Sequence, residues 1–352
     1  MSASIAVSKL KFSIFGRGYD DERGNSGSGV KDPAIYQGIS PNTACIDETE
    51  TYVWTTQSSG VSPIPYIRKR KLEDLSVVPQ TVLPDTGTRL YHPCNVANNY
   101  GVAFQNYWGT GDIYVFDLTT DELYFHISGG FGIEPRETVE CILVDNIIYF
   151  ISPGQFRQAV IFKLDLENET WAWVSEVTVL QGTSCGFVDN DTFYMYSHAP
   201  WFSDYNQRFG YSINGALQWV VTADIQGGTG FPNCKELGLC ANGYIWLPTY
   251  TDGKWHLGKY NGNTGGDFNT PTPLKVIGSF NSSPEYSTDY RHVHYSDGKA
   301  NGCWYSTTYG LLATNFEDVF VVNSGTWIPL AMTENIIFAR NRFSEQVGVF
   351  EY

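Results

Sequence analysis

Basic residues, long apolar runs and helical periodicity are scarce in this sequence, and each shortage excludes a class of protein. The 352 residues include 22 Lys and Arg against 37 Asp and Glu, a formal net charge of −15 at pH 7. Nucleic-acid binding needs concentrated basic side chains that displace counterions, so we expect no nucleic-acid partner. No apolar run approaches the roughly 20 residues of a membrane helix, so we expect no membrane insertion. No window keeps an apolar stripe at helical spacing, which predicts low helix content.

Catalytic and zinc-binding signatures are missing as well. The sequence has no Gly-x-Ser-x-Gly elbow, no His-Glu-x-x-His pair and no Walker or dinucleotide-binding glycine loop. The seven cysteines show no zinc-type spacing. Four of them recur four or five residues before a turn, namely Cys45, Cys94, Cys141 and Cys185. At that repeated position we expect small buried thiols, not disulfides.

The N-terminal region lacks the marks of a signal peptide. Residues 1–15 contain no uninterrupted apolar segment, which predicts cytoplasmic synthesis without a leader. Residues 16–33 are rich in glycine and serine, and we expect a mobile surface loop there. The only basic run, Arg68-Lys69-Arg70-Lys71, is typical of an exposed strand whose charged edge discourages aggregation.

The sequence does contain a phrase that recurs at a period of roughly 45–50 residues, which marks a repeat architecture. An acidic or amide turn residue is followed by an extended apolar run with an aromatic residue in its fourth position. The copies are Glu50 to Trp54, Asp145 to Tyr149, Asp189 to Phe193, Asn242 to Trp246, Asn301 to Tyr305 and Glu334 to Phe338, and Asn98 begins a further copy with Val102 in the fourth position.

Each repeat reads as four short strands. The third repeat predicts strands over 138–143, 147–152, 159–164 and 171–177, with polar turns between them. Short strands followed by Gly-, Asn- or Asp-containing turns favour sequential antiparallel sheets. Four-stranded units at this period are the blades of a β-propeller. No linker divides the chain and the repeat crosses its middle, so we expect a single domain over residues 1–352.

Two segments, 114–124 and 162–171, resemble the third-to-fourth-strand region of kelch or galactose-oxidase-type repeats within the β-propeller superfamily. The kelch double glycine is missing after the second strand, since Gly129-Gly130 follows the fourth. The resemblance implies an all-β propeller of four-stranded antiparallel blades. Repeat starts near Ala44, Leu90, Val139, Ser184, Glu236 and Arg291 give six blades, and Glu334 begins an incomplete seventh. We favour seven blades over six, with residues 347–352 beside residues 5–15 so that the two chain ends close the ring.

The connections after the second and fourth strands lie on one face of a propeller, and both sets read as long here. We expect ligand-binding residues there. The aromatic candidates are Tyr107, Trp108, Phe156, Trp201, Phe202, Tyr205 and Tyr250. A flat ring covers the apolar face of a sugar, and the same rings anchor protein interfaces. The sequence therefore favours a non-catalytic recognition or scaffolding protein with a glycan or protein partner.

Composition suggests one version of that hypothesis. Low lysine and glutamate content with abundant Asn, Thr, Gly and Tyr is similar to bacteriophage tail or fibre proteins. A structural subunit of a larger assembly, such as a virion, would fit this description.

The alternative hypothesis is a carbohydrate-active enzyme, either a glycoside hydrolase or a lyase. Arg89, Arg136 and Arg291 each precede the first strand of a repeat by a similar distance. Three arginines at a channel mouth clamp a carboxylate in sialidases, which are six-bladed propellers. The Ser-x-Asp-x-Gly-x-Thr-Trp box of sialidases is absent from this sequence, and we assign no catalytic residue.

Metal ligands are few. His292 and His294 alternate on one predicted strand and would suit a metal ion with a third ligand, although polar lining of the channel is the simpler interpretation. The oxygen-rich turns at 261–267 and 189–191 suit Ca²⁺, without the EF-hand pattern. We expect no cofactor, and Ca²⁺ is the one cation considered.

Overall fold

The computed structural model describes 19 segments of the chain, and the account below is confined to them. They are residues 34–37, 41–57, 66–79, 90–96, 100–105, 112–120, 122–128, 140–144, 147–153, 158–168, 170–178, 184–189, 192–198, 205–212, 217–224, 239–261, 273–282, 291–296 and 299–352. The loop predicted at 16–33 lies outside them. The described residues form strands and turns, and none of their segments is a helix long and apolar enough to cross a membrane.

The described strands form seven antiparallel sheets, numbered here in chain order. Sheet 1 has three strands, β2 (Pro41–Ile46), β3 (Tyr52–Gln57) and β4 (Tyr66–Lys71). Sheet 2 has β5 (Leu90–Val96), β6 (Tyr100–Gln105), β7 (Asp112–Asp117) and β8 (Leu123–Ser128). Sheet 3 has β9 (Glu140–Val144), β10 (Ile147–Pro153), β11 (Gln158–Asp165) and β12 (Thr170–Thr178).

The remaining sheets have four strands each. Sheet 4 has β13 (Ser184–Asp189), β14 (Thr192–His198), β15 (Tyr205–Ser212) and β16 (Leu217–Asp224). Sheet 5 has β17 (Leu239–Ala241), β18 (Tyr244–Thr251), β19 (Lys254–Asn261) and β20 (Lys275–Phe280). Sheet 6 has β21 (Arg291–Ser296), β22 (Lys299–Ser306), β23 (Gly310–Thr314) and β24 (Val319–Asn323). Sheet 7 has β25 (Trp327–Met332), β26 (Ile336–Asn341), β27 (Gln346–Glu351) and β1 (Ala34–Gln37).

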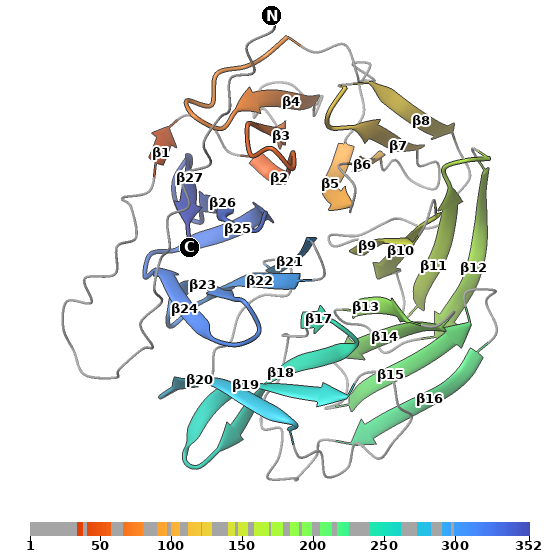
Figure 1. The fold of residues 1–352 in the computed structure, drawn as a ribbon, viewed down its shortest axis with the longest axis vertical. Helices are drawn as coiled ribbons and strands as arrows, with labels where there is room; N and C mark the ends of the chain where they lie inside the picture. The colour runs from red at the N-terminus through yellow and green to blue at the C-terminus, as the bar shows by residue number, and fades with distance from the viewer. Residues whose placement is uncertain are drawn as a thin grey trace, which may run out of the picture.

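The sheets are arranged around a common centre, with the first strand of each nearest to it (Figure 1). Neighbouring first strands are in contact: β2 with β5, β5 with β9, β9 with β13, β13 with β17, β17 with β21, β21 with β25, and β25 with β2. Antiparallel sheets set radially in this way make a β-propeller, so the predicted all-β propeller fold is confirmed.

The recurring phrase occupies a similar place in the sheets where its turn residue is described. Glu50, Asp189, Asn242 and Glu334 lie at or beside the turn between the first and second strands, whereas Asn301 is the third residue of β22. The fourth position of each copy lies on a second strand. Trp54 on β3, Trp246 on β18 and Phe338 on β26 are three examples, and all three side chains are buried. The predicted repeat starts at Leu90, Ser184 and Arg291 coincide with the first residues of β5, β13 and β21.

Alternation along the strands explains how each sheet packs against two neighbours. Ala44 and Ile46 on β2 belong to a core shared with sheet 7, where Ile328 and Phe338 lie. Cys45, between them in sequence, belongs instead to a core shared with sheet 2. Successive side chains of a strand point to opposite faces, so one strand supplies both cores. Cys45 is fully buried, as expected for the repeated cysteine position.

Strand β1, the first described strand, pairs with β27, the last strand of the chain. The pairing is antiparallel, with Ala34 opposite Val349 and Gln37 opposite Gln346. β27 also pairs with β26, so both of its edges are used. The strand beside β27 is thus Ala34–Gln37, whereas the predicted partner, residues 5–15, lies outside the described residues.

The interpretation of the basic run as an exposed strand is wrong for its two central residues. Lys69 and Arg70 on β4 are only 4% and 8% exposed. The Lys69 ammonium lies 3.9 Å from the ring centroid of Tyr52, and Arg70 donates a hydrogen bond of 3.0 Å to the carbonyl of Leu75. A cation over an aromatic face and a charge-assisted bond offset the cost of this burial.

Candidate functional site

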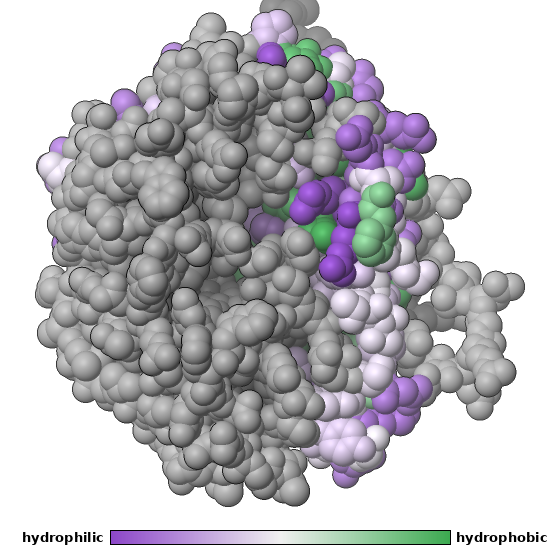
Figure 2. Space-filling view, turned by 180° about the vertical axis from the view of Figure 1, so that it is seen from behind, coloured by the Kyte–Doolittle hydropathy of each residue, from purple (hydrophilic) through white to green (hydrophobic). Residues whose placement is uncertain are grey.

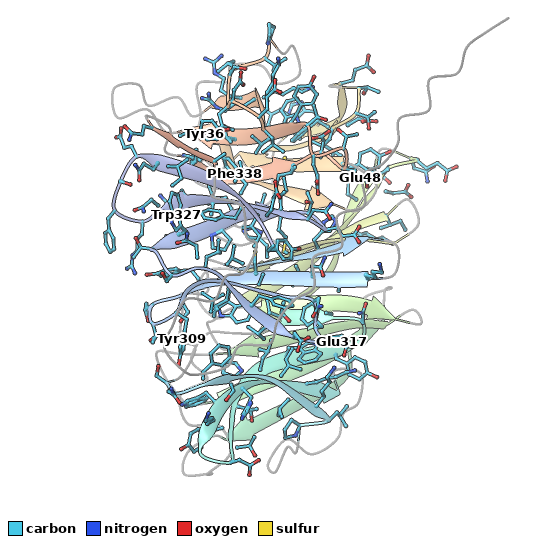
Figure 3. The ribbon with its side chains drawn as sticks, turned by 60° about the vertical axis from the view of Figure 1, so that its left-hand side comes forward. Tyr36, Glu48, Tyr309, Glu317, Trp327 and Phe338 are labelled. Atoms are coloured by element: carbon cyan, nitrogen blue, oxygen red, sulfur yellow. The ribbon has the colours of Figure 1, made fainter. Side chains whose placement is uncertain are left out.

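The two sides of the ring carry different turns. Because successive strands run in opposite directions, the turns after first and third strands lie on one side, and those after second and fourth strands lie on the other. Figure 3 shows Glu48 and Glu317 toward the first side, and Tyr309 and Trp327 toward the second. We call the first the acidic side, with the turns at 47–51, 72–76 and 314–318, and the second the aromatic side, with the turns at 251–254, 306–310 and 341–346.

Four aromatic residues form a continuous row on the aromatic side, across sheets 5 and 6. Tyr250 on β18 lies directly opposite Trp255 on β19, and Trp255 lies opposite Phe280 on β20. The ring centroids of Tyr250 and Trp255 are 5.4 Å apart, and those of Phe280 and Tyr309 are 5.0 Å apart. We call Tyr250, Trp255, Phe280 and Tyr309 the aromatic row.

The four rings of the aromatic row are buried to different extents. Phe280 is 5% exposed and belongs to the core between sheets 5 and 6, against which Trp255 and Tyr309 are partly packed. Tyr250 is 45% exposed. The row is therefore the outer margin of an inter-sheet core, with one buried ring, two half-buried rings and one ring open to solvent.

Local turn chemistry fixes these rings in place. Asp252 and Gly253 between β18 and β19 have φ of 52° and 78°, the two positive values that a type I′ hairpin turn needs. In the next sheet the Ser306 hydroxyl accepts hydrogen bonds from the backbone N–H groups of Thr308 (3.3 Å) and Tyr309 (3.2 Å). Both turns are short, and the second is held by these hydrogen bonds, so the row is pre-organised.

The Tyr309 phenol is held by a residue of the preceding sheet. Its oxygen accepts a hydrogen bond of 2.9 Å from the backbone N–H of Ser282 and lies 3.1 Å from the Ser282 hydroxyl. The phenol also lies 3.2 Å from the Ser282 carbonyl, to which it can donate. Ser282 follows β20, so these contacts connect sheet 5 to the turn of sheet 6.

A separate exposed ring lies on the turn of sheet 7. Phe343, between β26 and β27, is 76% exposed, the largest exposed fraction among the large hydrophobic residues that the structure describes. The Arg342 guanidinium lies 5.4 Å from its ring centroid. Among the described interactions, Phe343 has no contact with the aromatic row and is not part of it.

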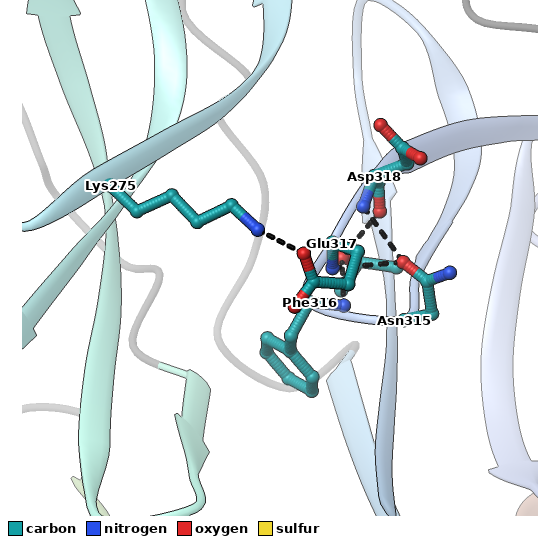
Figure 4. A network of polar contacts seen from close by, with 6 residues as sticks. Lys275, Asn315, Phe316, Glu317 and Asp318 are labelled. Atoms are coloured by element: carbon teal, nitrogen blue, oxygen red, sulfur yellow. Dashed lines mark hydrogen bonds and ion pairs between the residues drawn. The ribbon is translucent and has the colours of Figure 1, made fainter.

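Several acidic and amide side chains on the acidic side build turns. Asn315 accepts hydrogen bonds through its side-chain oxygen from the N–H groups of Glu317 (2.9 Å) and Asp318 (2.7 Å), and Glu317 pairs with Lys275 of sheet 5 (Figure 4). The bond from Lys275 lowers the pKa of Glu317. Asp165 similarly accepts from the turn between β11 and β12, and a hydrogen bond from Asn168 lowers its pKa. These acids therefore have structural roles in turns.

Near the centre of the ring, two histidines lie on the first strand of sheet 6. His292 contacts the carbonyl of Pro329 on β25 at 3.2 Å. Burial lowers the pKa of His294, while the nearby Glu334 and Glu50 carboxylates act in the opposite direction. In the part of the chain that the structure describes, no group of three His, Cys, Asp or Glu side chains is placed to hold a metal ion.

Three of the predicted site residues fall on described strands, all at the aromatic side of the ring. Tyr205 begins β15, Tyr250 lies near the end of β18, and Arg291 begins β21. They belong to sheets 4, 5 and 6, and only the Tyr250 side chain is described. The other predicted residues, Tyr107, Trp108, Phe156, Trp201, Phe202, Arg89 and Arg136, lie outside the described residues.

Sequence reasoning missed three members of the aromatic row, Trp255, Phe280 and Tyr309. It also expected long connections after the second strand, which is wrong for sheets 5, 6 and 7, where the described turns span only residues 252–253, 307–309 and 342–345. The Asp252-Gly253 dipeptide was a usable signal, because Asp-Gly between two alternating runs marks a tight hairpin with its flanking side chains at the turn.

Comparison with known proteins finds similarity in fold only. No family model matches the sequence and no curated protein matches it, so the kelch resemblance is not supported by a family assignment. Hydrazine synthase from Kuenenia stuttgartiensis aligns with a TM-score of 0.52 at 11% identity, over 89% of this chain and 95% of that chain. An oligogalacturonate lyase in complex with manganese aligns with a TM-score of 0.52 at 9% identity, over 92% and 96%.

Peptidases also occur among the similar structures. The β-propeller domain of the Trilobed protease from Pyrococcus furiosus aligns with a TM-score of 0.47 at 10% identity, over 90% of this chain and 95% of that chain. The chain covers 47% of the length of a prolyl endopeptidase with which it aligns, so it spans about half of that protein. At such identities these similarities concern the fold and no activity.

Proposed function

We propose that this protein is a non-catalytic recognition or scaffolding β-propeller that binds a glycan or protein partner through its aromatic side. The aromatic row carries the proposal. It joins two neighbouring sheets, its turns are fixed by internal hydrogen bonds, and its outermost ring, Tyr250, is 45% exposed. Binding residues are typically presented by connections that a rigid scaffold holds in position.

The finer architecture belongs to the same proposal. We infer that the seven sheets are seven blades and that β1 closes the ring by pairing with β27. Three observations support closure: the β1–β27 pairing, the shared core of sheets 1 and 7, and the hydrogen bond of 3.0 Å from the Asn335 side-chain amide to the Glu50 carboxylate. A closed ring keeps the turns of distant segments at fixed relative positions, which a multi-point binding surface needs.

We further propose cytoplasmic synthesis, from the character of residues 1–15, and a place in a larger assembly such as a virion, from composition. Trp108 and Trp201 are further candidates for the binding surface from their place in the sequence. The enzymatic alternative needs Arg89, Arg136 and Arg291 to converge, and the side chains of all three lie outside the described part of the structure.

The test compares two variants of the purified full chain. Wild type, Tyr250→Ala and Glu48→Gln, a conservative change on the acidic side, are applied to a glycan array and to an affinity-capture experiment with candidate partners. We expect Tyr250→Ala to reduce binding and Glu48→Gln to leave it unchanged, with the bound glycan recovered intact by mass spectrometry. Equal binding by all three proteins, or catalytic turnover of a bound glycan, would contradict the proposal.

A further inference from the structure

The described residues next to the aromatic row in sequence carry almost no net charge, although the whole chain is strongly acidic. Among residues 250–255, 281–282 and 307–309, the charged side chains are Asp252 and Lys254, which balance each other. The formal charge of the whole chain is −15. A surface without excess positive charge, on a molecule whose field repels anions, is poorly suited to an acidic ligand. The expected ligand is therefore neutral.

The groups around the row match a ligand with an apolar face and many hydroxyls. Tyr250 and Trp255 offer ring surface, while Ser282, Thr307 and Thr308 are exposed residues that carry hydroxyl groups. Ring faces bury apolar C–H surface, and hydroxyls both donate and accept hydrogen bonds. A neutral sugar has these two kinds of surface on one molecule.

The scarcity of exposed apolar side chains argues against a large protein interface here. In sheets 5 and 6, Tyr250 is the only large hydrophobic residue on the aromatic side that is exposed by more than a third among the residues described. Seen from behind, the described surface is mainly hydrophilic or intermediate in hydropathy, with few hydrophobic residues (Figure 2). A standard protein interface buries about 800 Å² per partner around an aromatic-rich centre, which is more than one such ring supplies.

The length of the row sets the size of the ligand. Its four rings follow neighbouring strands and the adjacent turn, which gives three steps of about 5 Å and a total of about 15 Å. This span fits a short chain of about two or three sugar units laid across the strands.

We propose that the aromatic row is a binding site for a neutral oligosaccharide, with Tyr250 and Trp255 as the stacking surface. Tyr309 positions the end of the site, because its phenol is held by Ser282 and its ring rests on Phe280. Phe280 is buried beneath the site and contributes almost no exposed surface. The inference rests on the proposed recognition function and names its ligand class.

The experiment is isothermal titration calorimetry on the full chain. The probes are maltotriose, cellotriose, xylotriose and chitotriose, with trigalacturonic acid as the anionic comparison. At least one neutral trisaccharide should bind and the anionic one should bind at least tenfold more weakly. Tyr250→Ala should weaken that binding at least tenfold, and Tyr250→Phe, which keeps the ring, should weaken it less than threefold.

Phe343→Ala is the matched control, since it removes an exposed ring on the same side but outside the row. It should leave the affinity unchanged, and circular dichroism should show that all variants are folded. The inference is overturned if no neutral trisaccharide binds, if the anionic one binds best, or if Phe343→Ala and Tyr250→Ala weaken binding equally.

Two outcomes separate this inference from the function on which it rests. If no saccharide binds but a defined protein partner does so in a Tyr250-dependent manner, the ligand class is wrong and the recognition function stands. If neither kind of ligand binds in a Tyr250-dependent manner, both are wrong.

Discussion

Replacing Gly310 by alanine should destabilise the protein far more than the same change at Gly253. Both glycines follow a second strand on the aromatic side, and both have positive φ, 85° at Gly310 and 78° at Gly253. A Cβ at Gly253 would meet no atom within 4 Å, whereas a Cβ at Gly310 would lie 2.3 Å from the carbonyl oxygen of Asn323 and 2.7 Å from the carbonyl carbon of Ser324. The pair therefore separates backbone strain from collision with backbone.

The magnitudes follow from these two terms. Positive φ costs an L-residue about 1 kcal/mol, which both variants share. Insertion of a methyl group into occupied space adds about 1–3 kcal/mol at Gly310 only. With an unfolding entropy of about 2.1 cal/mol/K per residue, a chain of 352 residues loses about 1.4 °C in Tm per kcal/mol. We expect a decrease of about 1–2 °C for Gly253→Ala and about 3–6 °C for Gly310→Ala.

Differential scanning fluorimetry at one scan rate measures both shifts, and urea unfolding followed by tryptophan fluorescence provides a second estimate. The clash would be with the end of β24, where the chain leaves sheet 6 for sheet 7. Equal shifts for the two variants would show that β23 and the end of β24 do not approach each other as described here, and would refute the reasoning.

Three further predictions concern the contact between sheets 1 and 7 and two buried side chains. Glu50 has a φ of 56°, and its carboxylate accepts a hydrogen bond from Thr333. Glu50→Ala should therefore lower the free energy of unfolding by about 1–2 kcal/mol in chemical denaturation, and Glu50→Gly should recover about 1 kcal/mol of that loss because glycine tolerates positive φ. Equal losses for the two variants would contradict this. The Cys303 thiol is fully buried and burial raises its pKa strongly, so Ellman's reagent should modify Cys303 only after unfolding, and rapid labelling of the native protein at this site would be contrary evidence. Burial lowers the pKa of His294 below its usual 6.5, so the unfolded chain binds the proton more tightly and the free energy of unfolding should fall as the pH drops through 6.5. Between pH 7.5 and pH 5.5, urea unfolding should show a smaller loss of stability for His294→Gln than for wild type. An equal or greater loss in the variant would argue against this effect.

The repeat could be predicted from sequence because its signals are local. An Asn-Gly or acidic turn followed by an alternating strand depends on a few neighbouring residues, as at Asn242, where φ is 50° and Gly243 follows with φ of 79°. The predicted third repeat differs from β9 to β12 by no more than two residues at any strand end. Fold class thus follows from spacing and turn chemistry.

The environment of the basic residues could not be predicted in the same way, because it depends on pairing between strands. Lys69 lies opposite Trp54, and Lys259 occupies the same relation to Trp246. The Lys259 ammonium lies 3.6 Å from the ring centroid of Tyr244, just as the Lys69 ammonium lies over the ring of Tyr52. Only the register shows that these lysines cover aromatic rings, so the sequence of the basic run alone predicts an exposed edge.

Trp255, Phe280 and Tyr309 of the aromatic row could not be predicted from sequence for a related reason. Trp255 and Phe280 sit in strands at positions that alternation assigns to the core, and they do pack on it. Their place in the aromatic row depends on how close each residue lies to the end of its strand on the aromatic side, and on the neighbouring turn that carries Tyr309. Those features come from the arrangement of sheets, which no single segment encodes.

The most direct test of the account follows the tryptophan indole N–H signals by ¹H–¹⁵N NMR during titration with the trisaccharide that binds best. The Trp255 signal, assigned with Trp255→Phe, should shift in proportion to occupancy, while the signals of the fully buried Trp54 and Trp304 stay in place. If the sugar binds and the Trp255 signal does not move, the ligand site lies elsewhere and the central claim is wrong.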